Sequence, residues 1–355
     1  MLIGLYGAGT LGRRIGRSLE QQFVFIDDTP AKAGMVMDEH EVIPLAEFAR
    51  RADGTDARIY ICIYQPGFVF ERKKHEVAAA HPAIECRPFT QLLLNQAAGA
   101  LPFLFFERPD RLAAKLERYR GLRRVLADDR SRATLDGHLR LRQSGCFDEI
   151  VWTSRRDLPF LLDRLPADVE YIDAGAFDGD TAEDFIEMTR GRFRSIRLVE
   201  PDPGPMPLAE RRMAMLGMAE RVMVRPEAIA AERGWAGFDC SGTVGSSLDP
   251  AAKHKVATVT LSDYERGNPL YFKLDIEGSE VAAIRASLDF IAERRVLLAV
   301  SVYHSPDDLL AVASMIPGLH AGYELFLRCH GSGGEDLMLY ALPNCALEGP
   351  PPVRR

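Results

Sequence analysis

The segment YIDAGAFDGDT, residues 171–181, has the pattern of a buried strand that runs into a tight turn and then a helix. The strand is predicted over 170–173 and stops at the carboxylate of Asp173. Two glycines then let the backbone turn sharply and approach a ligand closely, and Asp180 or Thr181 can cap the next helix. Sheets of parallel strands bind ligands outside the carboxyl ends of their strands. The segment therefore predicts a ligand-binding turn, with a polar turn that binds nothing as the alternative.

A second acidic position favours the ligand. The strand predicted over 196–199 ends at Glu200, 27 residues after Asp173. A carboxylate at the end of the second strand can accept hydrogen bonds from both hydroxyls of a ribose. The first turn lacks the phosphate-binding spacing GxGxxG and carries acids instead, namely Asp173, Asp178 and Asp180. Such a pocket repels a pyrophosphate and favours a cofactor with cationic groups, and S-adenosylmethionine has an ammonium and a sulfonium.

A third motif, KLDIEGSE, covers residues 273–280. Lys273 and Asp275 alternate along a predicted strand, so their side chains share one face. Burying both charges is costly unless they pair with each other or serve a ligand. Glu277 lies just past the strand end. The motif therefore indicates either a structural salt bridge or part of the site.

Strands and helices alternate after residue 169, which predicts an α/β fold with a parallel sheet. The last two strands follow each other without a long helix, so we expect a terminal antiparallel hairpin. Seven strands with such an end are typical of class I methyltransferases, and an insert near 238–247, with a strand at 258–261, interrupts the order. The predicted strands are 170–173, 196–199, 222–225, 271–275, 297–302, 323–327 and 337–341, and the predicted helices are 181–188, 207–216, 279–292 and 306–314.

The motifs YIDAGAFDGDT, LVEPDP, KLDIEGSE and LLAVSVYHSPDD, in this order, resemble the FkbM-type methyltransferase family. The resemblance covers 131–342 and implies an S-adenosylmethionine-dependent enzyme that methylates an oxygen of a sugar, glycan or secondary metabolite. It weakens over 229–247, where family members often show a Trp–aromatic pattern and this chain has AERGWAGFDCSGTVGSS. The cofactor contacts that it implies are Asp173, Gly175, Ala176, Asp180 and Thr181 on the methionine side, Glu200, Pro201 and Asp202 at the ribose, Glu227 and Ala228 near the adenine, and Asp275 beside them.

Transfer of a methyl group to a hydroxyl needs an aligned acceptor and usually a base for its proton. His304 follows the fifth strand, at the same sheet edge as Asp275, and could take that proton near neutral pH. A loop histidine that caps the next helix is the alternative. His330, in the loop FLRCHGSGG that we predict to be flexible, is a weaker candidate. We expect Lys273, Asp275 and His304 to act in catalysis, and Glu277, His304 and His330 to contact the acceptor.

The same side chains raise the question of a metal. Asp275, Glu277, His304 and His330 have the donor types of a divalent-metal site, and some sugar O-methyltransferases of other families use magnesium to orient a diol. No spacing among the four residues requires a metal, however. We therefore assign no metal ligand from the sequence and keep a divalent cation as the less favoured alternative.

A second glycine motif, GAGTLG, occupies residues 7–12 between a predicted strand over 2–6 and a helix over 13–21. Asp27 lies 20 residues after Gly7, as in dinucleotide sites, so an NAD(P)-dependent oxidoreductase is an alternative function. The domain is too small for both halves of a dinucleotide fold, and FIDDTPAKAG resembles the nucleotide-sugar-binding module found before some sugar acyltransferases. An empty Rossmann unit, or a non-catalytic nucleotide-sugar-binding protein, is the further alternative. We expect a nucleotide or nucleotide-sugar at Gly7, Gly9, Thr10, Leu11, Gly12, Asp27 and Asp28.

Length, charge and cysteines set the remaining limits. The 355 residues favour two domains, and we predict a Rossmann-like domain over 1–98, a helical connector over 99–165, a methyltransferase domain over 166–345 and a flexible tail over 346–355. The net charge of −7 argues against nucleic acid or a membrane surface as partner, and favours a small-molecule or glycan acceptor. A homo-oligomer is left open. Six cysteines without CxxC spacing, and a start without the features of a signal peptide, predict free thiols and a cytoplasmic protein.

Overall fold

The computed structural model describes residues 1–65, 67–240, 246–316 and 322–344. The chain forms two units, and the predicted helical connector is divided between them. Helices α5 (Pro109–Val125) and α6 (Asp129–Ser144) are each divided between them. The predicted tail and the centre of the insert, 241–245, lie outside the described residues. The first unit comprises Met1–Glu117, Ala133–Val151 and Gly331–Glu335, and the second Arg118–Arg132, Trp152–His330 and Asp336–Arg355.

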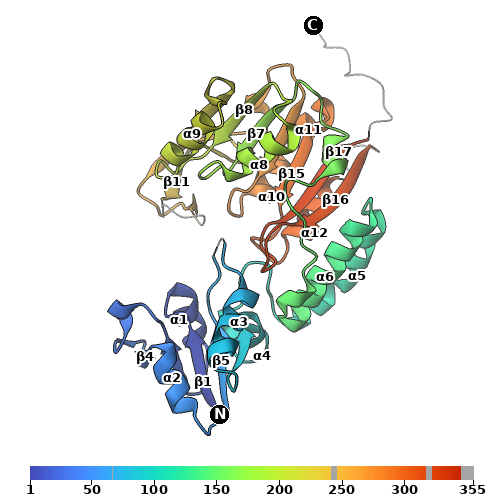
Figure 1. Cartoon of the computed structure of the whole chain (residues 1–355). Coiled ribbons are helices and arrows are strands. Elements are labelled where there is room, and N and C mark those ends of the chain that lie inside the picture. Colours follow the sequence, from blue (N-terminus) through green and yellow to red (C-terminus); the bar gives the residue numbers. More distant parts are fainter. Residues whose placement is uncertain (66, 241–245, 317–321, 345–355) are drawn as a thin grey trace. The chain divides into compact units, whose positions relative to one another are not determined.

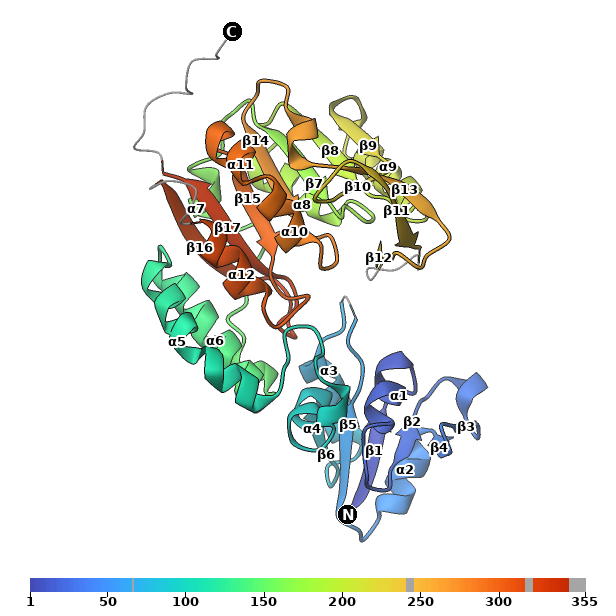
Figure 2. The same cartoon turned by 180° about the vertical axis from the view of Figure 1, so that it is seen from behind.

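The first unit is built on a six-stranded sheet of order β3-β4-β2-β1-β5-β6 (Figures 1 and 2). All neighbours are parallel except β3 and β4. The helix predicted over 13–21 is shorter and starts earlier, because Gly16 brings the backbone against the Phe23 ring and a turn follows. The elements are β1 (Leu2–Tyr6), α1 (Thr10–Gly16), β2 (Val24–Ile26), β3 (Val36–Met37), β4 (His40–Ile43), α2 (Leu45–Ala52), β5 (Ala57–Ile61), α3 (Phe70–Ala80), β6 (Glu85–Pro88) and α4 (Phe89–Asn95).

The second unit contains a seven-stranded sheet of order β16-β17-β15-β14-β7-β8-β9. Its neighbours are parallel except β17, which is antiparallel to both β15 and β16. Helices α8 and α9 cover one face of the sheet, and α10, α11 and α12 the other (Figures 1 and 2). This architecture confirms the predicted class I methyltransferase fold and its terminal hairpin. The elements are α7 (Pro159–Leu162), β7 (Glu170–Ala174), α8 (Asp180–Thr189), β8 (Ser195–Val199), α9 (Met206–Met215), β9 (Val222–Arg225), β14 (Leu270–Leu274), α10 (Glu280–Ala286), α11 (Leu288–Arg294), β15 (Leu297–Ser301), α12 (Asp308–Met315), β16 (Tyr323–Cys329) and β17 (Leu337–Pro343).

The central strands β7, β14 and β15 are buried along their whole length, which explains why their sequences are largely apolar. On the face under α8, Tyr171 stacks on Phe185 and on Tyr271, with ring centroids 4.2 and 5.1 Å apart. Burying one such ring contributes about 1.5–3 kcal/mol to folding. Asp173 and Lys273 are the charged side chains at the centre of these strands, and they mark the place of the site.

Two local features differ from the prediction. The helix predicted over 279–292 is broken at Ser287 into α10 and α11. The strand predicted over 258–261 ends at Val259, because Thr260 and Asp263 form a capping box that starts a 3-10 helix. A small sheet of order β10-β13-β11-β12 makes up the insert, from β10 (Glu227–Ile229), β11 (Gly234–Asp239), β12 (Ser247–Leu248) and β13 (Lys255–Val259). Among the described residues, no helix has the length and apolarity to cross a membrane.

Candidate active site

The turn after β7 is formed by glycines in the left-handed region, with φ of +71° at Gly175 and +82° at Gly179. A Cβ at Gly175 would lie 1.7 Å from the carbonyl oxygen of Asp275. The glycine is therefore required where the ends of β7 and β14 pack together. The predicted approach of a ligand to this glycine stays a prediction. Ala176 is buried in the core beneath the turn. The close packing fixes the turn rigidly to the segment after β14.

Asp173 is fully buried and its carboxylate is already bound within the protein. Its Oδ2 accepts a 2.6 Å hydrogen bond from Thr181, and its Oδ1 lies 3.2 Å from Nζ of Lys273. Lys273 also donates a 2.8 Å hydrogen bond to the carbonyl of Gly175. Burial works against the charged form of Lys273, but Asp173 and Asp275 outweigh it and raise the lysine pKa. These contacts hold the turn in place through Lys273. The catalytic role expected of Lys273 from the sequence stays a prediction.

Glu200 stands at the end of β8 and points back toward the turn. Its Oε2 accepts the backbone N–H of Phe177 at 2.9 Å, and its Oε1 accepts that of Asp202 at 2.8 Å. Burial raises the pKa of this carboxyl group. Each oxygen has a second lone pair beyond these bonds, so the carboxylate can still accept the two hydroxyls of a ribose. Pro201 and Asp202 continue the same turn, and Asp202 is buried and bonded to Ser246.

The remaining predicted cofactor contacts lie at the start of α8 and in the insert. Asp180 begins α8, is exposed, and lies 3.5 Å from Arg155. Glu227 and Ala228 directly follow the third strand, β9, and form the short strand β10, which begins the insert. Ala228 is buried there in a small apolar cluster, and Glu227 accepts a hydrogen bond from the hydroxyl of Tyr264.

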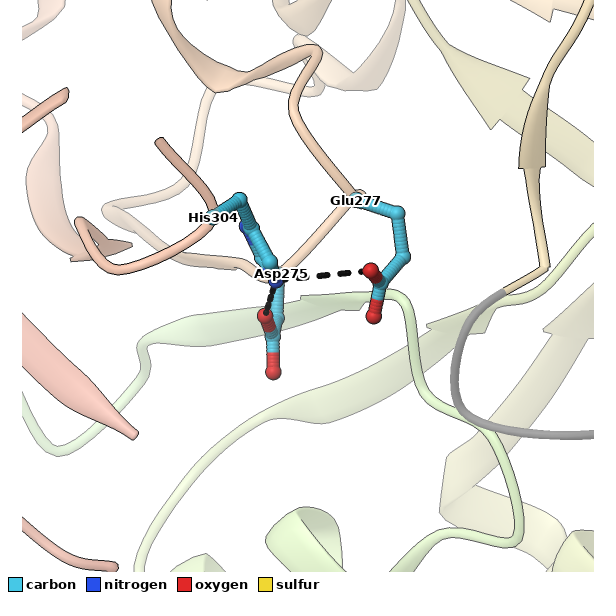
Figure 3. A group of neighbouring side chains, drawn as sticks. All are labelled: Asp275, Glu277 and His304. Carbon is cyan, nitrogen blue, oxygen red and sulfur yellow. Dashed lines mark ion pairs between the residues drawn. The ribbon is translucent and has the colours of Figure 1, made fainter. Parts of the chain in front are cut away.

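His304 is enclosed by three carboxylates that come from the loop after β14 and the start of α10. Figure 3 shows two of them, Asp275 and Glu277, beside the histidine. Its Nε2 lies 3.3 Å from Oδ1 of Asp275 and 3.6 Å from Oε2 of Glu277. Its Nδ1 lies 3.1 Å from Oε1 of Glu280. The histidine side chain is 6% exposed, and neither ring nitrogen makes a hydrogen bond of ordinary geometry with the described residues. The structure thus brings together Asp275, Glu277 and His304, which the sequence placed on one edge.

The carboxylates change the protonation of the histidine. Burial alone would lower the pKa of His304, but Glu280, Asp275 and Glu277 raise it to about 10. Burial also raises the pKa of Glu277 to about 7. The three carboxylates therefore favour the protonated form of His304 as long as no other cation lies among them. The base role of His304 stays a prediction. His304 does not cap the next helix, since Asp308 accepts the N–H of Ser305.

His330 lies at the end of β16, in the core and not in a flexible acceptor loop as predicted. Its ring nitrogens lie 2.7 Å from the carbonyl of Thr153 and 2.8 Å from the hydroxyl of Tyr340. Burial lowers its pKa to about 3. The ring lines a small, partly open cavity of about 40 Å³, which it shares with Lys273 and Asp275. Contact of His330 with an acceptor stays a prediction.

The glycine loop of the first unit has the expected shape. A Cβ at Gly12 would lie 2.0 Å from the carbonyl of Gly7, whereas Gly9 has open space around it. Thr10 and Leu11 begin α1. Asp27 accepts the N–H of Ala8 and pairs with Lys32 at 2.7 Å. Asp28 is bonded to the hydroxyl of Tyr6 and to the N–H of Leu45. A dinucleotide would need such carboxylates as acceptors for its ribose hydroxyls. Both carboxylates already make bonds within the unit.

The sequence reasoning did not single out Glu280 or Arg155. Glu280 is fully buried and accepts the N–H groups of Ile276 and Gly278, at 2.7 and 3.0 Å. An acid in the first turn of a helix after a glycine loop is a signal that could have identified it. Arg155 lies in the segment before β7 and pairs with Asp336 at 2.8 Å. No motif surrounds Arg155 in the sequence.

Comparisons with known proteins agree with this fold. Residues 173–325 match the family model of the methyltransferase FkbM domain, and this match supports a methyltransferase. A crystal structure of methyltransferase FkbM from Methylobacillus flagellatus KT superposes with a TM-score of 0.72 at 21% identity, and covers 96% of this chain and 89% of that chain. This likeness establishes the fold. A search of curated proteins gave no match.

Two other methyltransferase structures overlap only with part of the chain. An rRNA methylase from Streptococcus thermophilus aligns with a TM-score of 0.33 at 13% identity, over 52% of this chain and 93% of that one. An S-adenosylmethionine-dependent O-methyltransferase from Thermotoga maritima aligns with a TM-score of 0.30 at 14% identity, over 54% of this chain and 64% of that one. Similarities this low carry no argument about cofactor or substrate.

Proposed function

We propose that the second unit binds S-adenosylmethionine at the carboxyl edge of its seven-stranded sheet and transfers the methyl group to an oxygen of a small molecule or glycan. The observation that carries this proposal is the position of Glu200. Its buried carboxylate is held by two backbone N–H groups, at the end of the strand next to β7 and against the glycine turn. A carboxylate held in this way is suited to a ribose.

The rest of the turn suits the methionine half of the cofactor. Asp178 and Asp180 lie beside the start of α8 and pair with Arg212 and Arg155, so the ammonium of the cofactor would share these carboxylates with the two arginines. Asp173 acts indirectly, because its own oxygens are bound to Thr181 and Lys273. In the proposed reaction the acceptor oxygen would attack the methyl carbon, the bond from that carbon to the sulfonium sulfur would break to leave S-adenosylhomocysteine, and the hydroxyl proton would pass to a base or to water.

The acceptor is proposed to lie against the loops that follow β14 and β15. Asp275, Glu277 and His304 meet there, and the backbone of Asp275 packs directly on Gly175 of the cofactor turn. A sugar, glycan or secondary metabolite with a free hydroxyl is the acceptor class that fits a site of oxygen-binding and charged groups. The first unit is proposed to bind a nucleotide or nucleotide-sugar at Gly9, where the loop has room for a ligand.

Calorimetric titration of the whole protein tests the cofactor. We expect S-adenosylhomocysteine to bind with one site per chain, and NAD to bind without effect on it or not at all. Binding of NAD in the absence of any S-adenosylhomocysteine binding would overturn the proposal in favour of the oxidoreductase. Binding of neither ligand would favour a non-catalytic protein.

A further inference from the structure

We propose that Asp275, Glu277 and His304 form a binding site for one divalent cation of the manganese or magnesium class. Their donor atoms, two carboxylate oxygens and one imidazole nitrogen, all lie within 4.8 Å of one another. Neighbouring ligands of an octahedral ion with bonds of about 2.1 Å are about 3 Å apart. The contacts of 3.3 and 3.6 Å from Nε2 to the two carboxylates are close to this spacing.

The unsatisfied histidine is the second observation that points to a cation. The His304 ring is almost fully buried, and both its nitrogens lack a hydrogen bond of ordinary geometry. Its Nε2 faces the oxygens of Asp275 and Glu277, which can only accept when they are ionised. A lone pair on this nitrogen would therefore oppose the oxygens of these acids, so the arrangement requires either a shared proton or a bound metal cation between them. The experiment below distinguishes the two.

Glu280 supplies the support that a metal-binding histidine needs. Histidine ligands almost always donate their other ring N–H to a carboxylate or carbonyl, which fixes the tautomer. Oε1 of Glu280 lies 3.1 Å from Nδ1 of His304, so it can take this role and leave Nε2 for the ion. The same carboxylate holds the N–H groups of Ile276 and Gly278, on either side of Glu277. Glu280 thus positions two of the three ligands.

The local charge also favours a cation. Asp275, Glu277 and Glu280 place three carboxylates around His304, and Lys273 pairs with Asp275 and with the neighbouring Asp173. Burial of uncompensated negative charge is costly, and a divalent ion would offset it. If the proposed function holds, the open positions of the ion face the acceptor side of the cofactor turn, where they would take oxygen atoms of the acceptor. The ion itself does not depend on that function.

The test measures Mn²⁺ alone, without cofactor or acceptor, on the whole protein after chelator treatment. Electron paramagnetic resonance should show one bound Mn²⁺ per chain, which Mg²⁺ displaces. Electron spin-echo modulation of the wild type should show an imidazole nitrogen bound to the ion. Glu277→Gln should weaken binding at least 10-fold, and Glu280→Gln about 10–100-fold. Glu187→Gln, which removes a surface carboxylate paired with Arg156, should change binding less than twofold.

Two results would overturn the site. The first is that the wild type binds Mn²⁺ no more strongly than the double variant Asp275→Asn, Glu277→Gln does. This result would mean that His304 is a protonated partner of the three acids and not a metal ligand. The second is that the spin-echo spectrum of the wild type shows bound Mn²⁺ without a histidine nitrogen as ligand, which would place the ion elsewhere. This measurement uses the wild type alone, so it does not depend on the folding of any variant. Because S-adenosylhomocysteine is titrated separately, failure of the metal site and failure of the proposed function are distinguishable.

Discussion

Oδ1 of Asp173 lies 3.2 Å from Nζ of Lys273, and these two buried groups join the centre strands of the sheet. The same lysine donates to the carbonyl of Gly175. One pair therefore links the end of β7, the middle of β14 and the first residues of the cofactor turn. The stability of this ion pair and the geometry of the turn therefore depend on each other.

Removing the lysine should be strongly destabilising. Lys273→Met leaves Asp173 buried without a counter-charge, which typically costs about 3–5 kcal/mol. In a double-mutant cycle measured by urea unfolding, Asp173→Asn should cost much less in the Lys273→Met background than in the wild type. Additive effects of the two changes would show that the pair is not coupled and that Lys273 has another role.

A methyl group at Gly175 should be worse than one at an open glycine. Gly175→Ala costs about 1–2 kcal/mol because an alanine must adopt a positive φ. It also places the new Cβ against the Asp275 carbonyl. Gly217→Ala is the matched control, because Gly217 has a φ of +68° and no atom near the position of a Cβ. We expect Gly175→Ala to lose about 1–3 kcal/mol more than the control in urea unfolding. Equal losses would contradict the packing that we describe.

His330 should remain neutral in the folded protein far below its ordinary pKa. Burial lowers its pKa to about 3, while in the unfolded chain it titrates near 6.5. The unfolded state therefore binds more protons between these values, so stability falls as the pH drops below about 6.5, by up to about 1.4 kcal/mol per pH unit. Nitrogen NMR of the ring should show a neutral imidazole at pH 5. A midpoint near 6.5 in the folded protein would place His330 in water instead.

The glycine loop of the first unit allows structure and ligand binding to be separated. Gly12→Ala should destabilise the unit, because its Cβ would meet the Gly7 carbonyl. Gly9→Ala should leave unfolding unchanged, since Gly9 has an extended backbone and open space. If a nucleotide approaches the loop as proposed, Gly9→Ala should weaken UDP binding in calorimetry. Unaltered UDP affinity, or none in the wild type, would count for the empty Rossmann unit.

The fold was predictable because local patterns agreed with one another. Apolar strands, glycine turns and the missing helix before the last strand together specified the seven-stranded sheet. The helix break at Ser287 and strand β10 were missed because tertiary packing decides them, and not local propensity.

The position of the site was predictable from the sequence, but the protonation state of His304 was not. Asp275, Glu277 and His304 could be placed on one sheet edge from strand order alone. That the acids would enclose the histidine depends on Glu280 and on burial, which the sequence pattern does not show. The contacts of Lys273 with Asp173 and of His330 with Thr153 could not be predicted because the partners are far apart in the sequence.

The central claim is that the carboxyl edge of the seven-stranded sheet binds S-adenosylmethionine, and Glu200 tests it most directly. Glu200→Gln keeps the shape of the side chain but removes the charge that would hold the ribose. Charged hydrogen bonds are worth about 1.5–3 kcal/mol, so S-adenosylhomocysteine affinity should fall about 10–100-fold in calorimetry, while Glu187→Gln leaves it within twofold. Wild-type affinity in a folded Glu200→Gln protein would contradict the account.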